Sequence, residues 1–190
     1  MALPAEKALY TFADALEWDE GEYAEIIAGE IYMMGAPSSI HQEISVELTR
    51  QLANFLVGKP CRVYHAPFSV RLFEQDGDAP EDVDTVVQPD LSVVCDKSKI
   101  DKRGCKGAPD LVMEILSPAT QRHDRLVKLR LYQRAGVREY WIVNPEDQTA
   151  QVFTLSDGLL LPYELYDRES VAKVNVLEGC FIELNKVFIE

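Results

Sequence analysis

The sequence predicts an α/β fold in which a central mixed β-sheet is flanked by helices. Apolar residues make up 47% of the 190 residues, which is enough for one sizeable packed core. The middle of the chain also alternates apolar strand patterns with a helical pattern, in the order strand, strand, helix, strand. These segments cover residues 86–95, 111–116, 122–134 and 139–143.

The chain is expected to form a single domain, because no internal repeat, low-complexity segment or linker divides it. Within residues 1–190 we distinguish three parts: an N-terminal helix and hairpin at 1–35, a core at 36–155 and a C-terminal β extension at 156–190.

The N-terminal part predicts a short helix and a hairpin. Thr11 is a suitable N-cap for a helix over residues 12–18, with Asp14 in its first turn. Residues 22–34 place β-forming side chains on both sides of Ala28-Gly29, and this pattern predicts two strands joined by a turn at that dipeptide.

A long helix is predicted over residues 40–56, with Ser38 or Ser39 as its N-cap. Its apolar residues recur at helical spacing and form a stripe toward the core, made of Ile44, Leu48, Leu52 and Phe55. Two short strands follow at 61–65 and 68–73. In the second strand, Ser69 and Arg71 alternate with apolar residues and are expected to face solvent.

Two charged segments connect the predicted strands. Residues 74–84 carry six acids and no base, and their spacing does not match a calcium loop, so we expect a solvated hairpin tip. Residues 96–107 are expected to form a second connection. After the helix, which ends at Gly136, a turn at 144–147 should return the chain as an antiparallel strand at 150–155. Two further strands are predicted at 172–177 and 181–184.

The formal charge of −13 opposes any extended nucleic-acid surface, because binding to phosphates requires cations. The charge is unevenly distributed, however. From Arg122 to Arg138 there are six lysines or arginines and one acid, Asp124, which predicts a locally basic face. Within that segment, the residues expected to contact a nucleic-acid backbone are Arg122, Arg125 and Arg130.

Location and redox state can also be predicted from composition. The apolar runs are too short to span a bilayer, so no membrane partner is expected, and no secretory signal is visible. The four cysteines are scattered and form no C-x-x-C pair, which argues against a structural zinc and against a disulfide framework. We therefore expect reduced thiols in a cytoplasmic protein, at Cys61, Cys95, Cys105 and Cys180.

Two carboxylates occupy strands that are otherwise apolar. In the strand at 111–116, Glu114 shares a face with Val112 and Leu116, and Asp90 opens the apolar run that follows Pro89. A buried carboxylate is costly unless it meets a cation, a donor or a metal. Two carboxylates on neighbouring strands are what Mg²⁺ or Mn²⁺ requires from a protein, with room left for water and a phosphate.

The following helix supplies a cation for this pair. Lys128 could place a positive charge beside an attacking water or a phosphate. Asp124 lies four residues before Lys128 and Tyr132 four residues after it, so the three side chains share one helix face.

Each of these residues also has a structural interpretation. Asp90 after a proline suits a turn, and Glu114 could lie on an exposed strand face. Lys128 could be a solvated helix residue, and Asp124 could interact only with the helix dipole. His41, at the start of its helix, could cap or pack. The joint pattern is more informative than any of its members.

The joint pattern resembles the PD-(D/E)XK nuclease superfamily and, more closely, the bacterial Uma-type family described as "putative restriction endonucleases". The resemblance covers roughly residues 23–153. It is carried by Glu25, Gly29-Glu30, His41, Pro89-Asp90-Leu91, the segment from Pro109 to Pro118, Asp124, Lys128 and the segment from Tyr132 to Val143.

The resemblance implies a restriction-endonuclease-like core and a set of site residues. By analogy, Asp90 and Glu114 bind the metal, Mg²⁺ or Mn²⁺. The superfamily's lysine usually lies two residues after the second acid, where this chain has Leu116, and members of the closer family use a lysine from the next helix, here Lys128. Glu25 is a supporting candidate and His41 a weaker one.

Three functions remain open from the sequence. The first is a metal-dependent endonuclease that hydrolyses phosphodiester bonds of DNA, with Asp90, Glu114 and Lys128 as catalytic residues. The second is a nuclease-like fold that no longer cuts and serves as a binding or structural module. The third is a metal-dependent hydrolase of small phosphorylated substrates, which would need no large basic surface. Many nucleases of this fold pair to cut two strands, so a homodimer is a candidate assembly.

Overall fold

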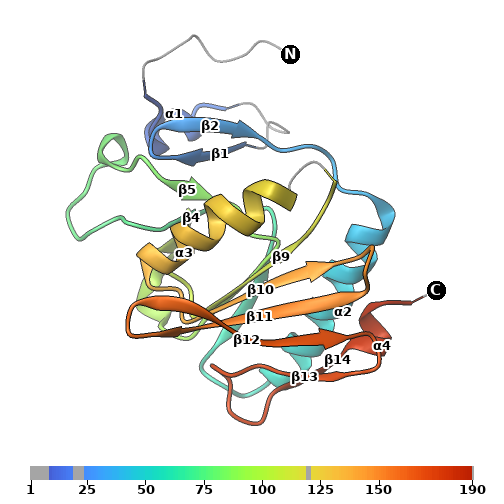
Figure 1. Cartoon of the computed structure of the whole chain (residues 1–190). Helices are drawn as coiled ribbons and strands as arrows, with labels where there is room; N and C mark the ends of the chain where they lie inside the picture. Colours follow the sequence, from blue (N-terminus) through green and yellow to red (C-terminus); the bar gives the residue numbers. More distant parts are fainter. Residues whose placement is uncertain (1–8, 19–23, 119–120, 190) are drawn as a thin grey trace.

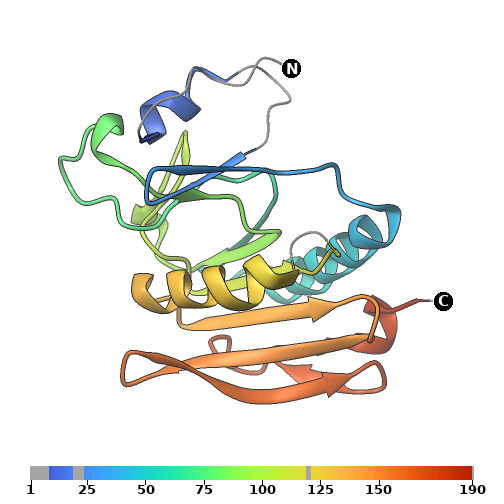
Figure 2. The same ribbon diagram turned by 45° about the horizontal axis from the view of Figure 1, so that its top comes forward.

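The computed structural model describes residues 9–18, 24–118 and 121–189. Its strands form two large mixed sheets, and helix α3 (Leu129–Ala135) runs between them (Figures 1 and 2). The predicted mixed α/β architecture is therefore confirmed, with two large sheets in place of one. No helix within the described ranges is long and apolar enough to cross a membrane.

The first sheet, sheet A, has the strand order β2-β1-β5-β4-β8-β7. Strands β4 and β8 are parallel and the other neighbours are antiparallel. The predicted N-terminal hairpin is confirmed as β1–β2, and both residues of its Ala28-Gly29 turn have positive φ. The strands are β1 (Ala24–Ile27), β2 (Glu30–Met33), β4 (Val70–Arg71), β5 (Val86–Val87), β7 (Ile100–Asp101) and β8 (Gly104–Lys106).

The second sheet, sheet B, has the order β12-β11-β10-β9-β6-β3 and contains the predicted central unit. Strands β9 and β10 are parallel, as expected for a crossover through a helix, and the other neighbours are antiparallel. Its strands are β3 (Arg62–His65), β6 (Leu91–Val94), β9 (Leu111–Ile115), β10 (Glu139–Asn144), β11 (Thr149–Ser156) and β12 (Leu159–Asp167). A small third sheet pairs β13 (Val171–Lys173) with β14 (Phe181–Glu183).

Most helices begin where their caps predict. Ser38 caps α2 (Ser39–Phe55) by accepting a hydrogen bond from His41 N at 3.2 Å, and Thr11 precedes the short α1 (Phe12–Ala15). The helix predicted at 122–134 contains a π-helical segment, η3 (His123–Lys128), which continues into α3 and ends at Gly136 with φ 84°. Residues 119–120 of the turn before it lie outside the described residues. The remaining short helices are η1 (Pro80–Asp82), η2 (Lys97–Lys99) and α4 (Leu184–Val187).

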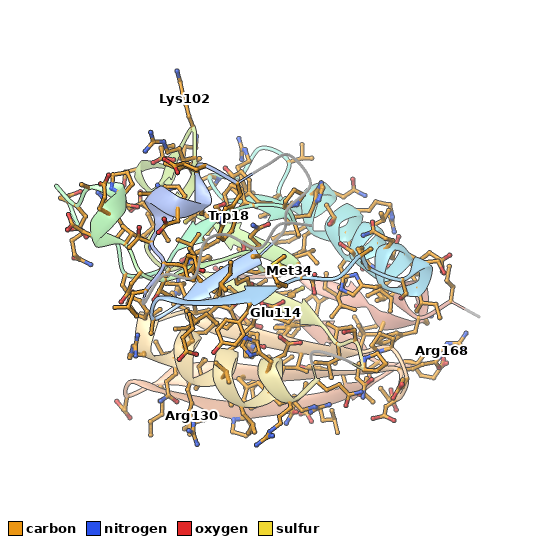
Figure 3. The ribbon with its side chains drawn as sticks, turned by 90° about the horizontal axis from the view of Figure 1, so that it is seen from above. Trp18, Met34, Lys102, Glu114, Arg130 and Arg168 are labelled. Atoms are coloured by element: carbon orange, nitrogen blue, oxygen red, sulfur yellow. A yellow bond between two sulfur atoms is a disulfide. The ribbon has the colours of Figure 1, made fainter. Side chains whose placement is uncertain are left out.

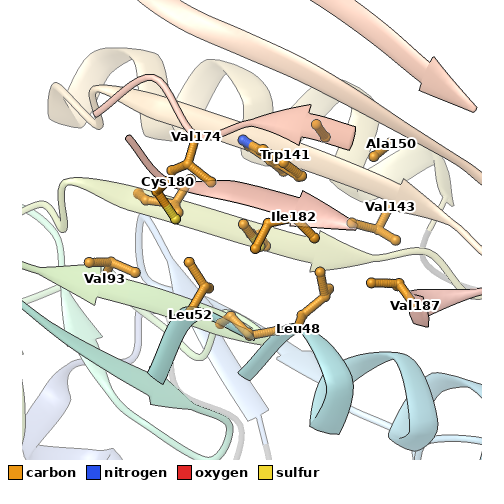
Figure 4. Close-up of a cluster of buried hydrophobic side chains, with 14 of the residues drawn as sticks. Leu48, Leu52, Val93, Trp141, Val143, Ala150, Val174, Cys180, Ile182 and Val187 are labelled. Atoms are coloured by element: carbon orange, nitrogen blue, oxygen red, sulfur yellow. The ribbon is translucent and has the colours of Figure 1, made fainter. Parts of the chain in front are cut away.

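Sheet B has an apolar core on each face. On one face, the predicted stripe of α2 packs against β6, β9 and β10, and the C-terminal segments complete this core (Figure 4). On the other face, Val112 and Leu116 pack with residues of α3 and of sheet A. The side chain of Glu114 shares this second face, so the strand alternation directs it into the space between sheet B, sheet A and α3.

The strand predicted over residues 86–95 is two strands in two sheets. Strand β5 belongs to sheet A, β6 belongs to sheet B, and Gln88-Pro89-Asp90 forms the bend between them. Pro89 has no N–H to continue a ladder, and the N–H of Gln88 donates to the side chain of Glu25 at 2.9 Å. The bend therefore places Asp90 where the two sheets meet.

Strands β7, β8 and β12 were not predicted. The β7–β8 hairpin is short and lies in the charged segment 96–107, where Gly104 adopts φ 120°. A Cβ on Gly104 would lie 2.0 Å from Ser69 O, so only glycine fits there. Strand β12 contains Pro162, which argues against a central strand but is tolerated at the sheet edge that β12 forms.

The expectation of four reduced thiols was wrong for two of them. Cys61 and Cys95 form a disulfide across strands β3 and β6. Arg62 pairs with Val94, so one more step in that antiparallel register places Cys61 opposite Cys95. Their spacing of 34 residues carries no signal of this proximity. Cys105 and Cys180 are free and buried, and burial raises the pKa of each thiol to about 11.

The prediction that Arg71 faces solvent was also wrong. Its side chain is only 1% exposed and forms ion pairs with Glu74 and Asp101. Its guanidinium also lies over the ring of Phe12, 5.0 Å from the ring centre. Arg71 is thus an internal cation that links sheet A to α1, a role that strand alternation alone cannot distinguish from a solvated one.

Candidate active site

A buried lysine stands at the centre of the candidate site. Lys128 Nζ lies 2.9 Å from Glu114 Oε1, 3.0 Å from Glu25 Oε1 and 3.7 Å from Asp124 Oδ1. All four side chains are between 4% and 5% exposed. Burial lowers the pKa of Lys128, but the surrounding carboxylates outweigh burial and raise it well above its ordinary value. The ammonium is therefore charged.

Glu114 reaches this lysine from the middle of sheet B. Its Oε1 accepts hydrogen bonds from Lys128 Nζ at 2.9 Å and from Tyr132 OH at 2.6 Å. Burial raises the pKa of Glu114 well above its ordinary range, and Lys128 opposes that rise. Figure 3 shows Glu114 in the interior, between the β1–β2 hairpin and the η3–α3 helix.

The η3–α3 helix contributes three groups from one face, as the spacing of Asp124, Lys128 and Tyr132 predicted. The π-helical geometry of η3 widens the turn, and such segments are frequent at functional sites. The carbonyl of Asp124 accepts a hydrogen bond from the buried Tyr140 OH at 3.1 Å, which ties η3 to strand β10. The ring of His123 also lies 4.7 Å from that of Tyr32 in β2.

Asp90 lies beside Glu114, although it is held by other groups. Leu91 pairs with Met113, so one more step in the register of β6 and β9 places Asp90 opposite Glu114. Asp90 Oδ2 accepts a hydrogen bond from Ile115 N at 2.7 Å and lies 3.2 Å from His41 Nε2. Burial lowers the pKa of His41, but the hydrogen bond and charge of Asp90 outweigh burial, so the pKa is raised.

Glu25 belongs to the same cluster, although it comes from sheet A. Its Oε1 accepts from the N–H of Gln88 at 2.9 Å and lies 3.0 Å from Lys128 Nζ. Glu25, Glu114 and Asp124 thus surround one ammonium, and Asp90 lies beside Glu114 as a fourth carboxylate of the cluster. The structure brings together all seven residues that the sequence singled out for the reaction centre: Glu25, His41, Asp90, Glu114, Asp124, Lys128 and Tyr132.

This donor set fits a magnesium-like ion. Within the described ranges, no three His, Cys, Asp or Glu side chains converge to form a ready cage for a metal. Mg²⁺, however, usually binds to one or two carboxylates and keeps several waters. Asp90 and Glu114 offer two carboxylates on adjacent strands, and the surplus of negative charge in the cluster favours a divalent cation.

The second Pro-Asp pair has a structural role. Asp110 immediately precedes β9, and its carboxylate accepts from Cys95 N at 2.8 Å and from Arg138 Nη1 at 3.0 Å. It thereby joins the end of β6 to the start of β9, whereas the lysine contacts Glu114 near the other end of β9. The preference for Asp90 over Asp110 agrees with this geometry.

The three predicted contact arginines lie on the outside of the same helix. Arg122 and Arg130 are exposed and Arg125 is half-buried, and Figure 3 shows Arg130 directed away from the interior. Within the described ranges, none of the three forms an ion pair. Exposed Leu126 and Val127 lie among them.

Sequence reasoning missed the contacts that join the elements. The N–H of Gln88 holds Glu25, and Tyr140 holds the carbonyl of Asp124. The sequence does not show which backbone N–H groups bind side chains. Pro89 was nevertheless a signal, because a proline interrupts strand pairing and can leave the N–H of its neighbour for another acceptor. Leu116 is 4% exposed and packs in the core, so an apolar core residue occupies the position two residues after Glu114.

Comparisons with known proteins identify the family and the fold of this chain. The family model Uma2, described as "Putative restriction endonuclease", matches residues 12–185. The chain belongs to the Uma2 family. A Synechocystis protein described as uncharacterized is 29% identical over 167 residues, which cover 85% of this chain and 84% of that protein.

A solved structure shows the same fold as this Uma2 chain. It is the crystal structure of a "putative nuclease belonging to DUF820" from Anabaena variabilis. The TM-score is 0.73 at 20% identity, and the match covers 94% of this chain and 97% of that one. The fold class and the family expected from the sequence are therefore confirmed.

Proposed function

We propose that this protein is a metal-dependent endonuclease that hydrolyses phosphodiester bonds of DNA. The observation that carries the proposal is the position of Lys128 against Glu114 and Glu25, with Asp90 opposite Glu114, in a chain of the Uma2 family. The lysine reaches Glu114 from the following helix and so replaces the one that Leu116 excludes.

Asp90 and Glu114 are the residues that would hold Mg²⁺ or Mn²⁺. When bound, the ion lowers the pKa of a coordinated water and offsets the negative charge of the phosphate. Burial raises the pKa of Glu114, and the charge of Lys128 opposes that rise and also favours the approach of a phosphate to an otherwise acidic cluster. Tyr132 fixes Glu114 through its hydroxyl, and the low exposure of both side chains strengthens this hydrogen bond.

The exposed arginines support a polymeric substrate. Arg122, Arg125 and Arg130 lie on the same helix as Lys128, so a nucleic-acid backbone bound along that helix would pass close to the site. A contact with several phosphates is needed to overcome the repulsion from a chain of net charge −13.

The test is cleavage of supercoiled plasmid by the purified chain with Mg²⁺, with Mn²⁺ and with chelator. We expect nicking that requires the ion, and a loss of about 100-fold or more in Glu114→Gln and Lys128→Ala. Asp110→Asn is the matched control, since it alters the acid of the second Pro-Asp pair, outside the cluster. Cleavage that survives in both site variants would overturn the proposed site.

The net charge of −13 favours a second candidate, hydrolysis of a small phosphorylated substrate, because such a ligand needs no long basic surface. Assays on duplex DNA, single-stranded DNA, RNA and mononucleotides separate the two. Turnover of mononucleotides alone would replace the first proposal with this one. Absence of turnover on all of them, with metal binding also absent, would point to a non-cutting module.

A further inference from the structure

Asp90 is held through only one of its two carboxylate oxygens. Oδ2 accepts from Ile115 N at 2.7 Å and lies 3.2 Å from His41 Nε2. In the part of the chain that the structure describes, no donor lies within hydrogen-bonding distance of Oδ1. Two donors on one oxygen restrict rotation of the carboxylate, and so they determine which oxygen faces the cluster.

Glu114 shows the same division of its two oxygens. Its Oε1 takes both Lys128 and Tyr132, whereas Oε2 meets no donor among the described residues. The two acids on neighbouring strands thus each have one anchored oxygen and one oxygen left for a ligand. Neither of these two oxygens is a buried atom without a partner, so each is open to water or to a cation.

His41 is well placed to act as a fixed anchor. It lies in the first turn of α2, where its backbone N–H is held by the Ser38 cap. Leu48 and Leu52, further along α2, are fully buried against sheet B, so the helix cannot shift without disturbing the core (Figure 4). The ring is 14% exposed, and its Nδ1 is buried with no partner. Asp90 is the side chain to which the ring is directed, and the backbone of Ile115 also lies beside the ring.

The other anchor of Asp90 is a main-chain group. Ile115 N belongs to the residue after Glu114, so it couples Asp90 to the strand of the second acid. A side-chain substitution does not remove this donor. His41 is the side chain whose loss would free the Asp90 carboxylate to rotate.

We propose that His41 is a positioning residue, which fixes the Asp90 carboxylate so that Oδ1 is presented to a divalent cation shared with Glu114. His41 fixes one oxygen of Asp90, in the same way as Tyr132 fixes one oxygen of Glu114. This inference rests on the proposed metal-dependent function, and it adds the group that sets the geometry of one ligand. Partners that orient metal ligands commonly contribute 10- to 100-fold in metal affinity.

The test is Mn²⁺ binding to the purified full chain, measured by titration calorimetry and by the loss of the free-Mn²⁺ electron paramagnetic resonance signal. In His41→Ala we expect the Kd for Mn²⁺ to rise by about 10- to 100-fold. His41→Gln should recover most of the affinity, because its amide nitrogen can occupy the place of Nε2. His41→Asn should not, because its side chain is one methylene shorter.

Two controls make the outcomes distinct. Gln42→Ala removes an exposed side chain from the same helical turn and should leave Mn²⁺ binding unchanged, while Asp90→Asn should abolish it. Circular dichroism and thermal unfolding establish that each variant is folded. Wild-type protein that binds no Mn²⁺ would overturn both the proposed function and this inference. Unchanged affinity in His41→Ala, or equal loss in His41→Ala and His41→Gln, would overturn the inference alone.

Discussion

Replacement of Lys128 by methionine tests whether the ammonium holds the two sheets together. At an effective dielectric constant of about 20, unit charges 3 Å apart attract by about 5–6 kcal/mol. Lys128 has two such contacts, to Glu114 at 2.9 Å and to Glu25 at 3.0 Å, and a weaker one to Asp124 at 3.7 Å. Desolvation of the ammonium offsets much of this attraction, and proton uptake by the carboxylates limits the loss further. We expect Lys128→Met to lower the free energy of unfolding by about 3–5 kcal/mol.

The assay is urea unfolding at neutral pH, followed by circular dichroism with the disulfide intact. With a slope of about 2 kcal/mol per molar urea, the midpoint should fall by about 2 M. Lys106→Met is the matched control, since Lys106 pairs with Asp76 on the surface and should leave the midpoint nearly unchanged. The difference between Lys128→Met and wild type should shrink as pH falls, because protonated carboxylates no longer require the cation.

A midpoint of Lys128→Met equal to that of Lys106→Met would refute this reasoning. A large difference that stays constant down to acidic pH would also refute it. Such a result would mean that the lysine stem stabilises by packing, whereas the charge contributes nothing. Addition of excess Mg²⁺ gives a further measurement, because an ion bound between Asp90 and Glu114 should restore part of the lost stability.

Three further predictions concern other parts of the molecule. The Cys61–Cys95 disulfide closes a separation of 34 residues, so its reduction should lower the free energy of unfolding by about 4 kcal/mol. A dithiol should therefore lower the urea midpoint of the wild type. It should not change the midpoint of a variant in which both cysteines are alanine. Burial raises the pKa of Glu139 above its ordinary value of 4.5, so the folded protein binds this proton more tightly than the unfolded chain does. The resulting stabilisation is complete at pH below 4.5 and is lost as the pH rises through the folded pKa. Glu139→Gln should therefore flatten the pH dependence of the urea midpoint above pH 4.5. Replacement of Arg122, Arg125 and Arg130 by glutamine should weaken the salt dependence of duplex DNA binding. The slope of the logarithm of the association constant against the logarithm of salt concentration should become less steep by about 2.7, whereas Arg50→Gln on α2 should not change it.

Local patterns in the sequence predicted the direction of several side chains in the candidate site. The alternation around Glu114 correctly placed its side chain on the face of Val112 and Leu116, and the four-residue spacing of Asp124 and Lys128 placed both on one helix face. These predictions succeed because side-chain direction follows from the period of a strand or helix. They need no knowledge of which elements pack together.

Features that depend on packing between distant segments were not predictable in this way. Composition could not reveal that Cys61 faces Cys95, because that contact depends on the register of β3 against β6. The apolar run at 86–95 likewise resembled one strand, and Pro89 alone could not reveal that the chain changes sheets there. Arg71 was assigned to solvent because it alternates with apolar residues, and its acidic partners, Glu74 and Asp101, lie outside its own strand.

The order of the site residues along the chain has a consequence for biosynthesis. All four acids of the cluster precede Lys128, so a growing polypeptide displays the carboxylates before the ammonium that balances them. At that stage, packing of the two sheets over the cluster would enclose like charges. We therefore expect the two sheets to close over the cluster only after the η3–α3 helix has been synthesised. A polypeptide that ends before Lys128 is expected to keep its four acids hydrated and apart.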